Sequence, residues 1–149
     1  MGECVDYKDW IKHDVFAVDG GPAIEIDLYR TNRAGDMIET HDVHMYISVC
    51  KSMIGTSHTD PFEKAFLKFV REWIESLFSS STRTPMEMTF SDFANKLTQL
   101  TDTSPQWNEA VKEKFSHYEG KIIPLKLHSD INTLGGRTHV THRAEFLVV

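Results

Sequence analysis

Cysteine is scarce in this chain of 149 residues, which has only Cys4 and Cys50. Two cysteines are too few for a disulfide framework, and we expect both thiols to be reduced, as in a cytosolic protein. Long apolar runs are also missing, and no stretch approaches the roughly 20 residues of a membrane span. The opening residues, MGECVDYKDW, lack the basic and apolar regions of a signal peptide. The sequence therefore predicts a protein of the cytoplasm that does not enter a membrane.

Basic residues are outnumbered, with 16 Lys and Arg against 22 Asp and Glu and a formal net charge of −6. A protein that grips nucleic acid through its phosphates needs a basic surface, so tight binding of DNA or RNA is not expected. No Gly-rich loop leads from a strand into a helix, and no Ser or Cys lies in a nucleophile motif. The sequence predicts a single domain over 1–149, with no catalytic residues and no cofactor.

The clearest alternation of apolar and polar residues lies in the segment from Asp36 to Cys50. Apolar side chains occupy every second position from Val43 to Val49, which is typical of a half-buried strand. The segment from Ala23 to Tyr29 alternates in the same way, and the connection TNRAGD contains turn-forming Asn and Gly. These two segments predict a long β-hairpin.

Alternation returns near the end of the chain and predicts a second hairpin. Ile123, Leu125 and Leu127 are expected to form one apolar face of a strand, in which Pro124 marks an open edge. The turn-forming run NTLGG then leads into a last strand from Thr138 to the end of the chain.

Apolar residues at helical spacing predict four helices. The best defined has Asp60 as N-cap, Pro61 in its first turn and a broad apolar stripe as far as Leu77. All three tryptophans, Trp10, Trp73 and Trp107, are expected in the core. The predicted helices cover 5–16, Asp60 to about Phe78, a segment that begins near Thr89 or Ser91, and Ser104 to Gly120.

The order of these elements predicts the fold class. A short helix, a hairpin, three helices and a second hairpin give an α+β domain, with one antiparallel sheet and helices packed on one face. The opposite, polar face is left uncovered, and two tyrosines on it favour an interface. We expect this interface to include Glu25, Asp27, Tyr29, His44, Tyr46, Lys126, His128, Arg143 and Glu145.

Eight histidines raise the question of a metal site. The pattern T-H-x-x-H occurs at 40–44 and at 138–142, but residues three apart on a strand point to opposite faces and cannot chelate one ion. An ion held between strands by His44, His128 and His139 is the alternative. Solvated or interface histidines are the expected state, so we predict no bound zinc or iron, and we expect His142 in the core.

Several features together resemble the tail terminator and related neck-ring proteins of tailed bacteriophages. They are an opening helix, a strand that starts at Pro22, a long alternating strand from Asp42 to Cys50, an amphipathic helix over 60–78 and a closing strand over 143–149. The two helices between Phe90 and Glu119 exceed what that family usually has before its last hairpin, and no residue role is carried over. The resemblance implies a non-enzymatic subunit of an oligomeric ring, usually a hexamer.

Such a ring implies a place in the virion or in the cytoplasm of the infected host. Its partners would be further copies of the chain and other virion proteins of the tail tube and neck, and DNA would pass through its lumen without being held. One alternative is a small acidic binding protein that acts on a host or confers immunity. The other is an enzyme of the tunnelling fold or of the two-histidine phosphoesterases, since His139-Val140-Thr141 resembles half of their paired H-x-T signature.

Overall fold

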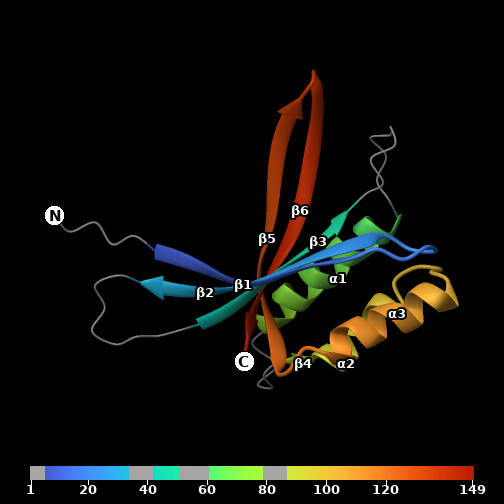
Figure 1. Cartoon of the computed structure of the whole chain (residues 1–149), viewed down its shortest axis with the longest axis horizontal. Helices are drawn as coiled ribbons and strands as arrows, with labels where there is room; N and C mark the ends of the chain where they lie inside the picture. Colours follow the sequence, from blue (N-terminus) through green and yellow to red (C-terminus); the bar gives the residue numbers. More distant parts are fainter. Residues whose placement is uncertain (1–5, 34–41, 51–60, 79–86) are drawn as a thin grey trace.

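The computed structural model describes residues 6–33, 42–50, 61–78 and 87–149. These residues form one six-stranded antiparallel sheet in the order β1-β2-β3-β6-β5-β4, with three helices against one of its faces (Figure 1). The expected α+β class is therefore confirmed. The elements are β1 Asp6–Phe16, β2 Ala23–Arg33, β3 Asp42–Cys50, α1 Pro61–Leu77, β4 Met88–Thr89, α2 Phe90–Leu97, α3 Pro105–Ser116, β5 Lys121–Leu134 and β6 Arg137–Val148.

The three long helices lie where the sequence predicts them. Thr89 caps α2 by accepting a hydrogen bond from the Asp92 amide at 3.1 Å, and Ser104 caps α3 by accepting one from the Trp107 amide at 3.0 Å. The expected cap of α1, Asp60, lies outside the described residues. Each helix buries an apolar stripe against the sheet, and Val70 of α1 is fully buried.

The segment expected to form the first helix is instead the edge strand β1. It pairs with β2 along its length, from Asp6 opposite Arg33 to Phe16 opposite Ile24. A bulge at Ile11 interrupts the ladder and hides the alternation that would have revealed a strand. The helix prediction was wrong because the hydrogen bonds to β2 outweigh a weak local spacing of apolar residues.

A polar contact also fixes β1 against the end of α3. Asp14 accepts a hydrogen bond from the Tyr118 hydroxyl at 2.9 Å and forms an ion pair with Lys114 at 3.2 Å. Burial raises the pKa of Asp14, but the hydrogen bonds from Tyr118 and Lys114 outweigh burial, and the pKa lies below its usual value. Asp14 therefore stays ionised and holds the strand in place.

A second bulge, in β5, changes which of its side chains point towards the helices. Pro124 pairs with Phe146 and Lys126 pairs with the adjacent Glu145, so a single residue, Leu125, is left over between them. Pro124 is buried on the helix side, whereas Leu125 is 40% exposed. The expectation that Ile123, Leu125 and Leu127 share one apolar face is wrong, because the bulge shifts the side-chain phase by one. Leu127 pairs with buried Ala144 on the helix side, whereas Ile123 pairs with Leu147 on the opposite face. β4 pairs only with Lys121 and Ile122, so Pro124 does lie at an edge without a described neighbour strand.

Aromatic side chains form the centre of the core between the helices and the sheet. Phe93 of α2 meets Phe146 of β6 edge to face, with ring centroids 5.5 Å apart. Trp73 of α1 lies 5.8 Å from Phe146, and Phe115 of α3 lies 5.5 Å from Phe93. One ring from each helix thus converges near a single strand, which couples all three helices to the sheet.

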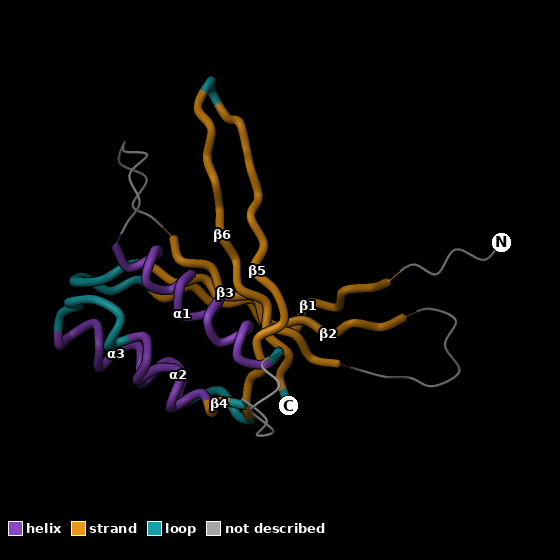
Figure 2. Tube along the Cα trace, turned by 180° about the vertical axis from the view of Figure 1, so that it is seen from behind, coloured by secondary structure: helices purple, strands orange, loops and turns teal. Residues whose placement is uncertain are grey.

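The β5–β6 hairpin is longer than the sheet behind it. β3 pairs with β6 only between Arg143 and Val148, so the part of the hairpin nearer the Gly135-Gly136 turn extends as a two-stranded ribbon. Figures 1 and 2 show this ribbon projecting away from the helices and from β1 and β2.

The position of Trp73 gives a first prediction, because its side chain is only 5% exposed and contacts aromatic rings on two other elements. Trp73→Ala should lower the free energy of unfolding by about 3–5 kcal/mol, as other large-to-small aromatic core changes do. Chemical denaturation measures this loss. Phe78→Ala is the matched control, since Phe78 is 84% exposed. Equal small losses in both variants would show that the helix does not pack as described.

Candidate functional site

The sheet face opposite the helices, called the open face below, has no helix over it in the described part of the chain (Figure 1). The register of the ladders places side chains on it in rows that cross five strands. All nine residues predicted for the interface lie on this face. The rows are Trp10, Tyr29, His44, Leu147 and Ile123; then His13, Asp27, Tyr46, Glu145 and Lys126; then Val15, Glu25, Ser48, Arg143 and His128.

A single carboxylate on β6, that of Glu145, joins side chains of three other strands. Its Oε2 accepts a hydrogen bond from the Tyr29 hydroxyl at 2.7 Å and lies 3.0 Å from Nδ1 of His44. Its Oε1 lies 2.7 Å from Nε2 of His128. Glu145 is thus the central acceptor of a polar network that links β2, β3, β5 and β6.

The electrostatics of this network favour an ionised Glu145. Burial raises its pKa, but the hydrogen bonds from Tyr29, His128 and His44 outweigh burial, and the pKa lies below its usual value. Burial also raises the pKa of Tyr29, and hydrogen bonds to Tyr46 and Glu145 raise it further. Tyr29 therefore keeps its proton and remains a donor to the carboxylate at any ordinary pH.

Stacked rings fill the space around the carboxylate. The ring centroids of Tyr29 and Tyr46 lie 4.7 Å apart, and His44 stacks on Tyr29 at 5.2 Å. The Arg143 guanidinium lies over the Tyr46 ring at 5.0 Å. As a result Tyr29 is only 1% exposed and Tyr46 only 6%. Two exposed tyrosines were expected here, and that expectation is wrong, because neighbours on the same face bury both rings.

The most exposed apolar side chains in the rows of the open face, Trp10 and Val15, lie on β1, which the sequence had assigned to a helix. Trp10 is 60% exposed, with its ring centroid 5.5 Å from that of Tyr29, and Val15 is 55% exposed. Trp10 was expected in the core with Trp73 and Trp107, and this was wrong for Trp10 alone. The sequence signal was missed because the alternation on either side of Ile11 is out of phase.

The described histidines do not form the metal site of His44, His128 and His139 that the sequence left open as an alternative. His44 and His128 both face Glu145, and the side chain of His139 lies outside the described residues. His142 is not a core residue. It is partly exposed, with Nδ1 2.9 Å from the Ser129 hydroxyl and Nε2 3.7 Å from Oε1 of Glu63.

Another cluster of potential metal ligands lies at the edge of the open face. His13 of β1 is paired with Asp27 of β2 and hydrogen-bonds to its carboxylate through Nδ1, while Nε2 lies 3.6 Å from Oε1 of Glu25. One ligand atom from each of these residues lies within 4.8 Å of the other two, and no other group of three His, Cys, Asp or Glu in the described ranges meets this condition.

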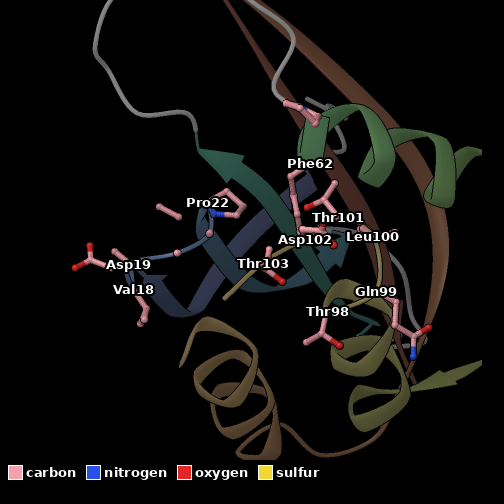
Figure 3. Close-up of a pocket in the computed structure, with 15 residues that line it drawn as sticks. Val18, Asp19, Pro22, Phe62, Thr98, Gln99, Leu100, Thr101, Asp102 and Thr103 are labelled. Atoms are coloured by element: carbon pink, nitrogen blue, oxygen red, sulfur yellow. The ribbon is translucent and has the colours of Figure 1, made fainter. Parts of the chain in front are cut away.

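A separate open hollow of about 1270 Å³ lies between the β1–β2 turn, the start of α1 and the loop between α2 and α3 (Figure 3). Among the described residues that line it there is no Lys, Arg, His or Cys, and the charged side chains are Asp19 and Asp102. One wall is held together by hydrogen bonds from the Ser104 amide to the Gly20 carbonyl and from Trp107 Nε1 to the Pro22 carbonyl, each at 3.0 Å.

The glycine pair in this wall has a packing role. A Cβ on Gly21 would lie 2.6 Å from atoms of the Trp107 ring, and one on Gly20 would lie 2.0 Å from the Ser104 hydroxyl oxygen. Gly20 also has a φ of 97°, which other residues rarely adopt. The pair therefore lets the β1–β2 turn approach the N-terminus of α3.

Comparison with protein-family models, with curated proteins and with solved structures found no match.

The Glu145 network gives a second prediction. At neutral pH, Glu145→Gln should lower the free energy of unfolding by about 1.5–3 kcal/mol, because hydrogen bonds to a charged acceptor are lost. Since the folded-state pKa of Glu145 is lowered, its stabilising effect is present above its usual pKa and is lost as the pH falls through the folded-state value. The free energies of unfolding of the wild type and of Glu145→Gln, measured by chemical denaturation, should therefore converge at acid pH.

Glu72→Gln on α1 is the matched control, because Glu72 is exposed. It should leave stability within about 0.5 kcal/mol of the wild type, as most surface changes do. A difference between wild type and Glu145→Gln that stays constant down to acid pH would contradict the ionised state of Glu145.

Proposed function

We propose that the chain is a non-enzymatic structural subunit that assembles with further copies of itself through the open face. The observation that carries the proposal is the exposure of Trp10 and Val15 on that face, at 60% and 55%. Exposed aromatic and aliphatic side chains within a polar surround are typical of protein interfaces. In an assembly they would be removed from water.

The network around Glu145 supports a structural role over acid–base catalysis. A general acid or base works best with a pKa near the operating pH, and its reactive atom must reach the substrate. Glu145 has a lowered pKa, and both of its oxygens already contact protein donors. The network is suited to holding four strands of the open face in register.

The edges of the sheet favour assembly through its face. An open strand edge invites pairing with another chain, and bulges, Lys and Pro are the usual devices that prevent it. β1 has its bulge at Ile11, followed by Lys12, and β5 has Pro124 followed by the bulge at Leu125. β1 and the part of β5 around Pro124 therefore disfavour strand addition, whereas the open face carries charges of both signs and suits pairing with a second copy.

A ring of the kind formed by phage tail terminators is the assembly that we favour. Its place would be the virion or the host cytoplasm, and its partners would be the tail-tube and neck proteins. A net charge of −6 suits a lumen that DNA crosses without being held. The edge strand β1 stands where that family has its opening helix, so the proposal depends on the open face and not on the element order.

No helix in the described ranges is long and apolar enough to cross a membrane.

The alternative is a small acidic protein that binds one basic partner, and the carboxylates of Glu25 and Asp27, which lie opposite exposed Val15 and His13, favour it. The two proposed functions predict different particle masses. A ring subunit forms a homo-oligomer by itself, whereas a binding protein stays monomeric until its partner is added.

Self-assembly gives a third prediction. In light-scattering measurements after gel filtration, the wild-type protein should form a homo-oligomer, and the double variant Trp10→Ser, Val15→Ser should be monomeric. The monomer fold should persist, because both side chains are more than half exposed. Circular dichroism checks the fold.

Phe78→Ser is the matched control, since it removes an aromatic residue that is 84% exposed but does not lie on the open face. It should assemble like the wild type. A wild-type protein that is monomeric at every concentration, or a double variant with the wild-type mass, would contradict assembly through this face.

A further inference from the structure

The pairing of β1 with β2 brings three potential metal ligands to one edge of the open face. His13 and Asp27 are directly opposite each other in the ladder. Glu25 lies two residues before Asp27 on β2, so its side chain is on the same face. The helix expected for 5–16 would have separated His13 from both carboxylates. Only the strand, with its bulge at Ile11, gives His13 this register.

The ligand atoms are already close to the arrangement that one ion requires. All three atoms lie within 4.8 Å of one another. Ligands at roughly 2.0–2.2 Å from a tetrahedral zinc ion are separated by roughly 3.3–3.6 Å. One ion takes a single imidazole nitrogen, whereas His13 contacts Asp27 through Nδ1 and Glu25 through Nε2. Side-chain rotations that replace one of these contacts would close the three ligands around an ion.

We propose that His13, Glu25 and Asp27 form a binding site for a divalent transition metal ion of borderline softness, of which zinc is the representative. One imidazole nitrogen and two carboxylate oxygens match the ligands that such ions accept in proteins. Magnesium and calcium prefer oxygen ligands alone and are disfavoured by the histidine. The proposal replaces the expectation of a metal-free chain, which was argued from other histidines.

Exposure differs among the three ligands in a way that leaves the ion accessible. The Asp27 side chain is 15% exposed and anchors the inner end of the site, whereas Glu25 is 38% and His13 56% exposed. Three protein ligands leave a fourth tetrahedral position, and the exposure of His13 and Glu25 would let solvent reach it. Water or an exchangeable ligand atom would complete the coordination.

The test is a zinc titration of the untagged full-length protein after treatment with a chelator, with a chromophoric chelator as competitor. The wild-type protein should bind one zinc ion per chain, and zinc should raise its melting temperature. His13→Ala and Glu25→Gln should each weaken binding by at least about tenfold, since even loss of an outer-shell partner costs 10–100-fold. Excess magnesium should not displace the ion.

His117→Ala is the matched control, because His117 is an exposed histidine at the end of α3. It should bind zinc like the wild type. Absence of saturable binding by the wild type would overturn the proposal, as would wild-type affinity in both His13→Ala and Glu25→Gln. Zinc is counted for each chain, so a failure of this proposal can be distinguished from a failure of self-assembly.

Discussion

The pairing of β3 with β6 is the interaction on which the rest of the structure depends. The first three strands and the last hairpin are far apart in sequence, and this ladder, from Val43 opposite Val148 to Ser48 opposite Arg143, makes them one sheet. It places Tyr46 directly opposite Glu145, and Ile47 opposite Ala144 on the other face. A slip of one residue would exchange the two faces. Both the aromatic core and the open face therefore depend on one register.

The two faces of the sheet are stabilised in different ways. On the helix side, apolar burial dominates, with Phe146 fully buried between rings of α1 and α2. On the open face, burial comes from stacked tyrosines around an ionised Glu145 that accepts hydrogen bonds from its neighbours. This polar packing occupies the middle of the face, and Trp10 and His13 lie exposed towards its β1 edge. We propose that contacts with other molecules concentrate at this edge.

Much of the fold could be predicted from local patterns, because the signals for α1, α2 and α3 and for the two hairpins lie within short segments. The prediction failed at Ile11 and at Leu125, where bulges break the period of two on which a strand is recognised. The nine predicted residues lie on the open face, but the contribution of β1 to this face and the burial of Tyr29 were not predicted. Alternation tells which face a side chain occupies and not how closely its neighbours pack around it. The trio at His13 depends on the pairing partner of β1, which no local pattern specifies.

The most direct test of the central claim, that copies assemble through the open face, is iodide quenching of tryptophan fluorescence as a function of protein concentration. Trp73 and Trp107 are buried, at 5% and 0% exposure, so Trp10 is the tryptophan within reach of iodide. Assembly through the open face predicts that the quenchable fraction falls as the concentration rises, because Trp10 becomes covered. A quenchable fraction that stays constant while the particle mass increases would show that copies meet elsewhere and would contradict the account.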